Sequence, residues 1–120
     1  MNDRGTAVVE FALILPLVLL LVLALAEVVA TGRVQLELTH AAREGARVAA
    51  TVPDPARAVD AVQQALPSGL ADEVGVHVVR PHVVGQRAEV SVTSRRRVAG
   101  QLFGGFAVEL HAKAVMRVEQ

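Results

Sequence analysis

The chain contains no cysteine, tryptophan or tyrosine, and its only aromatic residues are three phenylalanines. Without cysteine it can form no disulfide and offers no thiolate for catalysis or metal binding. Its 12 lysines and arginines are balanced by 12 aspartates and glutamates, so the formal charge is zero. Because phosphate binding needs a basic excess and base stacking needs aromatic rings, we expect no nucleic acid partner.

The residue patterns typical of catalytic and metal sites are missing as well. No two histidines are spaced four apart on a helix, and they lie at His40, His77, His82 and His111. The serines lie outside any nucleophile elbow, and no glycine-rich phosphate-binding loop follows a strand. We therefore predict that the chain is not an enzyme and has no catalytic residue, no metal site and no cofactor.

A long apolar run dominates the N-terminal part of the sequence. From Phe11 to Ala26 no side chain carries a charge or a hydrogen-bonding group, and the run continues to Ala30 with Glu27 as its interruption. The resulting length of about 20 residues is what a helix needs to cross a bilayer core. Pro16 removes one backbone donor, a defect that a membrane helix tolerates better than a soluble one.

Two kinds of targeting segment could contain this run. A secretory signal peptide would be cleaved after a small-x-small motif, which Ala24-Leu25-Ala26 provides. However, the segment before the run carries only Arg4, offset by Asp3, and the apolar pattern continues without a break. The second kind is a short polar leader ending in glycine, followed by a helix with glutamate at its fifth position. Gly5 and Glu10 fit this second pattern.

The sequence resembles the TadE-like pseudopilins of tight-adherence (Flp-type) pilus systems in two stretches, RGTAVVEFALILPLVLLLVLALAE and HAAREGARVAA. The resemblance implies a pilin-like fold and cleavage between Gly5 and Thr6 by a membrane-embedded aspartyl prepilin peptidase, which is a separate protein. It also implies other pilins or pseudopilins and the Tad inner-membrane machinery as partners. Phe11 stands where major pilins usually have tyrosine, which favours a minor component over the main filament subunit.

Glu10 and Phe11 are the residues that we associate with assembly. A carboxylate just inside an apolar run is costly unless it stays near the interface or finds a partner. Cleavage would make Thr6 a cationic N-terminus, one helical turn from Glu10, and opposite charges attract strongly in a low dielectric. The alternative is a glutamate that reaches the lipid headgroups and has no further role.

The helix is predicted to continue to about residue 50, beyond the apolar run. Arg33 with Glu37, and His40 with Glu44, are spaced to pair on its surface. Small residues follow one side of this second half, at Ala41, Ala42, Gly45, Ala46 and Ala49. Such a stripe allows close approach of another backbone, either the chain's own sheet or a neighbouring subunit.

The remainder reads as a small α+β domain. Pro53 and Pro55 end the long helix, and Asp54 is the predicted N-cap of a short helix over 55–66 that closes at residues 67–69. Alternating apolar and polar residues predict strands over 74–80, 87–95 and 108–118. We expect the long N-terminal helix to pack on this small antiparallel sheet.

Two features of the domain have alternative interpretations. The run Arg95-Arg96-Arg97 is either a solvated strand end or a contact for anionic headgroups or an acidic partner. The loop over 98–107 is unusually apolar because it contains Leu102, Phe103 and Phe106. It either tucks under the sheet or docks on a membrane or partner.

Taken together, these patterns predict a leader over residues 1–5, a transmembrane helix over 6–30 and an extracytoplasmic domain over 31–120. The N-terminus is expected in the cytoplasm on the basis of the leader, because the flanking charges are nearly balanced. We interpret the chain as a pseudopilin, a minor pilin or assembly factor of a Tad/Flp-type pilus or a type II- or type IV-like secretion apparatus, which could enter an extracellular pilus after processing. The alternative is a single-pass anchored extracytoplasmic binding module that is never assembled into a filament.

Overall fold

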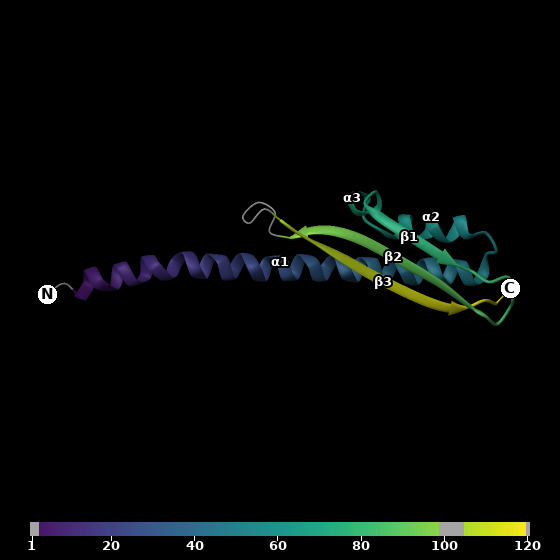
Figure 1. Cartoon of the computed structure of the whole chain (residues 1–120), viewed down its shortest axis with the longest axis horizontal. Helices are drawn as coiled ribbons and strands as arrows, with labels where there is room; N and C mark the ends of the chain where they lie inside the picture. Colours follow the sequence, from purple (N-terminus) through teal and green to yellow (C-terminus); the bar gives the residue numbers. More distant parts are fainter. Residues whose placement is uncertain (1–2, 99–104, 120) are drawn as a thin grey trace. The chain divides into compact units, whose positions relative to one another are not determined.

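The computed structural model describes residues 3–98 and 105–119. Within these residues the fold is α+β, as predicted, with three helices followed by three strands (Figure 1). The elements are α1 (Asp3–Thr51), α2 (Pro55–Ala65), α3 (Ser68–Ala71), β1 (Val74–Val79), β2 (Arg87–Val98) and β3 (Phe106–Arg117). The chain divides into two compact units, Met1–Gly32 and Arg33–Gln120, and the boundary falls within α1.

Helix α1 extends through both the apolar run and the amphipathic stretch that follows it. Its first part is rich in leucine and alanine, which are strong helix formers. Pro16 lies inside the helix, and the helical assignment continues through it. The helix ends where Pro53 begins the connection to α2, close to the end predicted from the sequence.

Helix α2 is capped as the sequence predicts. The Asp54 carboxylate accepts a hydrogen bond from the Ala56 backbone N–H at 3.0 Å, and Pro55 occupies the first turn, where no backbone donor is needed. Helix α3 was not predicted. The Pro67 carbonyl accepts hydrogen bonds from Leu70 and Ala71, so the proline that ends one helix begins another single turn.

The three strands form an antiparallel sheet in the order β1-β2-β3. Val78 pairs with Val90, and Val92 pairs with Ala112. The alternation along β2 directs one set of side chains into the core, namely Ala88, Val90, Val92 and Ser94. Gly85, in the connection before β2, has a φ of 88°, which a residue with a side chain rarely adopts.

The β2–β3 hairpin is longer than predicted. The alternation of apolar and polar residues predicts a middle strand over 87–95. The ladder instead continues through Arg96↔Val108 and Arg97↔Ala107 to Val98↔Phe106. Backbone pairing with β3 therefore extends the strand beyond the point where its side chains have a core to fill.

The hydrophobic core lies wholly within the second unit. It is formed by α1 from residue 38 onward, by α2 and by one face of the sheet, and its members are Leu38, Ala41, Ala42, Ala46, Ala49, Ala58, Val62, Leu66, Ala88, Val90, Val92, Ala112, Ala114 and Val118. Gly45 lies where these elements meet. A Cβ placed on Gly45 would be 2.4 Å from Val62 Cγ2 and 3.1 Å from Val90 Cγ1. The helices thus pack closely because the residue between them has no side chain.

Candidate membrane anchor and processing site

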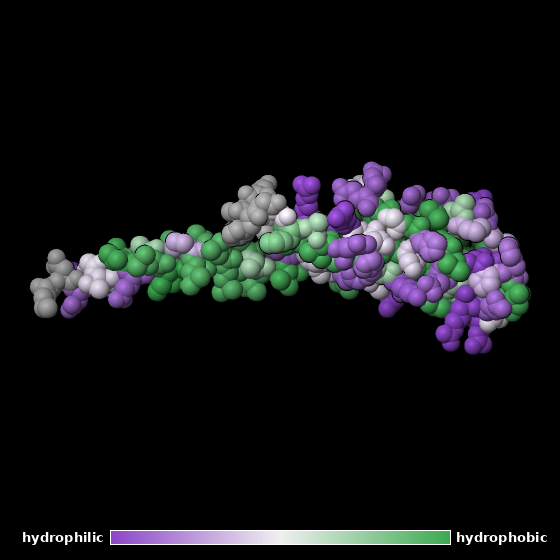
Figure 2. All heavy atoms as spheres, viewed as in Figure 1, coloured by the Kyte–Doolittle hydropathy of each residue, from purple (hydrophilic) through white to green (hydrophobic). Residues whose placement is uncertain are grey.

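The first part of α1 has an apolar surface that is exposed among the residues the structure describes. Figure 2 shows hydrophobic residues covering this part of the molecule. Among the described residues, one helix is long and apolar enough to cross a membrane, it lies near the N-terminus, and none of its most apolar window is buried. Leu13 is 73% exposed and Leu17 is 67% exposed. An exposed apolar surface of this size suits contact with lipid or with other apolar helices.

Gly5 and Thr6, the predicted cleavage pair, lie in the first turn of α1 and are exposed. The first four backbone N–H groups of a helix have no partner within the helix. Glycine also weakens helical structure by about 1 kcal/mol relative to alanine. The bond between Gly5 and Thr6 therefore lies where the helix is easiest to unwind into the extended form that a protease binds.

Glu10 and Phe11 follow on the same helix, and both are exposed. Residues four apart in a helix lie on the same side, with roughly 6 Å of rise between them. The structure thus places Glu10 one turn from Thr6, the residue that cleavage would make the N-terminus. Their roles in processing and assembly remain predictions.

The small-residue stripe lies in the second unit and inside the domain. Ala41, Ala42, Gly45, Ala46 and Ala49 are all buried. Gly45 approaches Ala58 of α2 as well as Val62 and Val90. Of the two partners considered from the sequence, the structure therefore places the chain's own helix α2 and sheet against this stripe.

The contacts that end α1 could not be predicted from sequence patterns. The last carbonyls of a helix have no partner within it. Here the Ala49 carbonyl accepts a hydrogen bond from Arg80 Nε at 2.6 Å, and the Ala50 carbonyl accepts one from the Glu119 N–H at 3.0 Å. Both donors come from distant parts of the chain, so local patterns could not reveal them. Nearer the unit boundary, Gln35 Nε2 donates to the His111 carbonyl at 2.7 Å.

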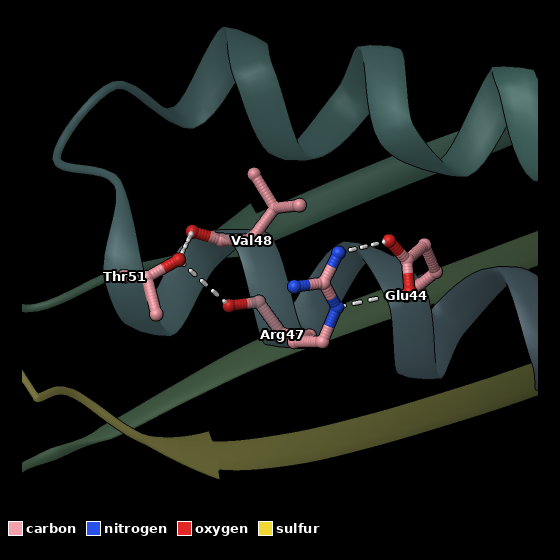
Figure 3. Close-up of polar contacts among 4 residues, drawn as sticks. All are labelled: Glu44, Arg47, Val48 and Thr51. Atoms are coloured by element: carbon pink, nitrogen blue, oxygen red, sulfur yellow. Dashed lines mark hydrogen bonds and ion pairs between the residues drawn. The ribbon is translucent and has the colours of Figure 1, made fainter.

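Figure 3 shows an ion pair on the surface of α1 that differs from the predicted one. Glu44 interacts with Arg47, not His40, and the guanidinium reaches both carboxylate oxygens, at 2.6 and 3.1 Å. The planar guanidinium matches a carboxylate in this two-point geometry, which an imidazole cannot reproduce. Hydrogen bonding from Arg47 lowers the pKa of Glu44, and the same bond raises the pKa of Arg47. Thr51 Oγ1 donates to the backbone carbonyls of Arg47 and Val48 nearby.

The histidines lie on different elements. His40 is on α1, His77 on β1, His82 in the connection between β1 and β2, and His111 on β3. His111 Nε2 lies 3.6 Å from Glu109 Oε1 on the exposed surface. Over residues 3–98 and 105–119, no group of three or more residues is arranged to hold a metal ion.

The arginine run and the apolar residues that follow it form the end of the β2–β3 hairpin. Arg95 and Arg97 are exposed on one face of β2. Phe106 is 70% exposed, so this residue of the loop does not tuck under the sheet. Leu102 and Phe103 lie outside the described residues.

The chain thus combines an exposed apolar N-terminal helix segment, long enough to cross a membrane, with a small α+β domain. Residues 5–47 match the model of the TadE-like protein family. The resemblance recognised in the sequence is therefore confirmed over this segment, which contains Gly5, Thr6, Glu10 and most of the small-residue stripe. No curated protein and no solved structure gives a significant match to the chain.

Proposed function

We propose that this chain is a membrane-anchored pseudopilin, a minor subunit or assembly factor of a tight-adherence pilus or a related secretion apparatus. One observation carries the proposal. The segment that matches the TadE-like family, residues 5–47, coincides with the helix whose apolar surface the chain leaves exposed. Such a surface suits a subunit that is stored in lipid and then packed among like helices.

The proposed division of the chain follows from this role. Residues 1–5 are a cytoplasmic leader, residues 6–30 cross the membrane and residues 31–120 form an extracytoplasmic domain. The exposure of the apolar run and the burial of residues from Leu38 onward support this division. The prepilin peptidase, the Tad inner-membrane machinery and other pilins or pseudopilins are the partners that the proposal requires.

Processing begins with local unwinding of the first turn. The peptidase hydrolyses the Gly5–Thr6 peptide bond, which releases residues 1–5 and leaves a cationic amine on Thr6. The glycine has no Cβ, so the backbone fits closely in an extended protease cleft. The exposure of both residues in α1 supports access to this bond.

Assembly would then depend on the positive charge of the new Thr6 amine. The Thr6 amine pairs with Glu10 of the same helix or of a neighbouring one, and the surrounding apolar side chains strengthen this attraction by lowering the dielectric. An unpaired charge in such surroundings is strongly unfavourable, so the pair favours a defined register between helices. Phe11 packs beside the pair.

Intact-mass measurement of the protein purified from its native host tests the processing step. The pseudopilin role predicts loss of the mass of Met1–Gly5. An intact N-terminus without co-purifying pilus proteins would support the anchored binding module instead. A mature chain that begins at Glu27 would establish a signal peptide and contradict both membrane-anchored roles.

Glu10→Gln tests the proposed charge pair. The variant keeps the size and hydrogen-bonding capacity of the side chain and removes its charge. We expect normal membrane insertion and normal cleavage, together with loss of pili, because the Thr6 amine loses its countercharge. Membrane fraction, leader cleavage and pilus number should be measured in the same strains, with Glu27→Gln as the matched control. Normal pili in the Glu10 variant would contradict the charge pair, and failed cleavage would assign Glu10 to peptidase recognition.

A further inference from the structure

The connection between β1 and β2 presents two adjacent apolar side chains to solvent. Val83 is 57% exposed and Val84 is 62% exposed. Backbone hydrogen bonds hold this connection in a fixed shape. Val118 exchanges two of them with Gly85 and Gln86, each at 2.8 Å, and the Gln86 N–H donates to the Val83 carbonyl at 3.2 Å. Single exposed valines are common, but an adjacent pair on a fixed turn is a preorganised contact surface.

Two arginines follow this turn on one face of the sheet. Arg87 begins β2 and pairs directly with Arg117 of β3, and both residues are exposed. Their face is turned away from the core, because the next residue, Ala88, is buried. Glu89 lies on the same face, and its carboxylate is 2.8 Å from Lys113 Nζ. Like charges directly opposite each other repel, so a carboxylate from outside the domain would relieve the repulsion between the arginines.

A groove between α1 and α2 has the complementary character. Its volume is about 720 Å³, and its apolar lining is formed by Val48, Val52, Ala61 and Ala65. Glu44 and Asp60 add two carboxylates, together with one guanidinium from Arg57. Because Arg47 already contacts both carboxylate oxygens of Glu44, Asp60 is the better placed of the two acids to receive another cation.

The turn and the groove belong to different layers of the domain. The groove is lined by two helices, whereas the turn joins two strands and is tied to the end of the β3 segment by its hydrogen bonds. A domain therefore cannot fill its own groove with its own turn, but a second copy of the chain can. Contact between two unlike surfaces of identical chains leaves a turn and a groove free at the two ends, so further copies can add in a row.

We propose that the β1–β2 connection of one copy inserts into the groove between α1 and α2 of a second copy. Val83 and Val84 pack on the apolar lining of the groove, and the arginine pair at positions 87 and 117 faces Asp60. Both surfaces lie within the second unit of the chain. The inference goes beyond the proposed function, because it requires neither leader cleavage nor membrane insertion and can fail while that function holds.

The absence of cysteine allows a direct test by disulfide cross-linking between introduced cysteines. His82→Cys lies beside the two valines, Gln64→Cys lies in the wall of the groove, and both positions are exposed. Full chains that carry one or the other substitution, with different affinity tags, are mixed in detergent micelles and oxidised. We expect cross-links between the differently tagged chains. Ser68→Cys, at an exposed position on α3 outside the groove, replaces Gln64→Cys as the matched control and should give none.

Two pairs of variants measure what each part of the contact contributes. Val83→Ser combined with Val84→Ser should lower the rate of cross-linking about tenfold or more, because both valines normally leave water in the contact. Val108→Ser, at an exposed valine in the opposite end of the sheet, should not change it. Asp60→Asn should lower the rate about threefold at low ionic strength and little in high salt. Asp72→Asn, at an exposed aspartate outside the groove, should have no effect in either.

A chain that carries both His82→Cys and Gln64→Cys tests whether copies add in a row. We expect a series of oligomers larger than the dimer, and a product that stops at the dimer would overturn the repeating arrangement. Equal cross-linking of position 82 to positions 64 and 68 would overturn the proposal, as would a rate that the two valine substitutions leave unchanged. Cross-links of position 64 that form only when extract of the native host is added would assign the groove to another protein and overturn the contact between copies. Circular dichroism of each variant establishes that the fold is retained.

Discussion

The two halves of helix α1 share one secondary structure and have opposite surroundings. Before Gly32, its side chains are mainly leucine and valine, and the large ones are exposed. After Arg33, its inward-facing side chains are mainly alanine, with Leu38 as the largest, and they are buried. The half with the more hydrophobic side chains is the one that the protein's own core does not use.

This difference shows that hydrophobicity and burial within the fold are separate properties. Large apolar side chains suit a lipid environment, where they need no matching surface. Small ones suit the domain, because they let α1 approach α2 and the sheet closely enough to exclude water. A single helix can thus carry an anchor and a core face, distinguished by side-chain size.

We expect the largest difference in domain stability when one leucine in each half of α1 is replaced by alanine. Leu38→Ala removes the largest core side chain of α1, which is fully buried, and should destabilise the domain by about 2–5 kcal/mol. Leu20→Ala, at an exposed position in the apolar half, should leave domain stability unchanged. Chemical denaturation in detergent, followed by circular dichroism and by hydrogen exchange of the β2 amides, measures both. Similar destabilisation by the two variants would contradict the separation of the halves.

A second comparison uses the two glycines of α1. Gly45→Val adds a side chain where Val62 already lies within 2.4 Å of the Cβ position, so overpacking should cost about 1–3 kcal/mol. Gly32→Val meets nothing within 4 Å and should change domain stability by about 0.5 kcal/mol or less. Thermal unfolding of both variants provides the test. A neutral Gly45→Val would mean that α1 and α2 can separate without loss of stability.

The smallest expected effect on stability concerns the ion pair between Glu44 and Arg47, on the exposed side of the second half of α1. The pKa of Glu44 is lowered from its ordinary value of 4.5, so the bond to Arg47 adds stability above that pH and loses it as the pH falls through the lowered folded-state pKa. Glu44→Gln should therefore flatten the dependence of stability on pH below about 4.5 and leave the rest of the profile unchanged. Because both side chains are well exposed, we expect only a slight change. Unfolding midpoints across this acidic range, with Glu37→Gln as control, measure it.

Much of this architecture could be predicted because its determinants are local. The apolar run predicted the exposed anchor helix, alternation predicted the core faces of β2 and β3, and Asp54 before Pro55 predicted the start of α2. The motif around Gly5 and Glu10 identified the TadE-like family, which the family match then confirmed over residues 5–47.

The features that could not be predicted depend on partners far away in the sequence. The extension of β2 past Arg95 requires the ladder with β3, and the end of α1 requires donors from Arg80 and Glu119. The turn that forms α3 was missed for a different reason, since Pro67 was interpreted only as a helix terminator. The exposure of Phe106 depends on where the core ends, which no alternation pattern can show.

The pairing of α1 with the last strand has a consequence during synthesis. The core face of α1 is complete once residue 51 has been made, but β3 and Val118, which help to cover it, come about 67 residues later. At a synthesis rate of about 5–20 residues per second, this interval lasts roughly 3–13 seconds. During that time the apolar half of α1 is already complete, while the alanine-rich face of the other half remains without part of its sheet. The two halves therefore reach their final surroundings at different moments, and the domain closes last at its C-terminal strand.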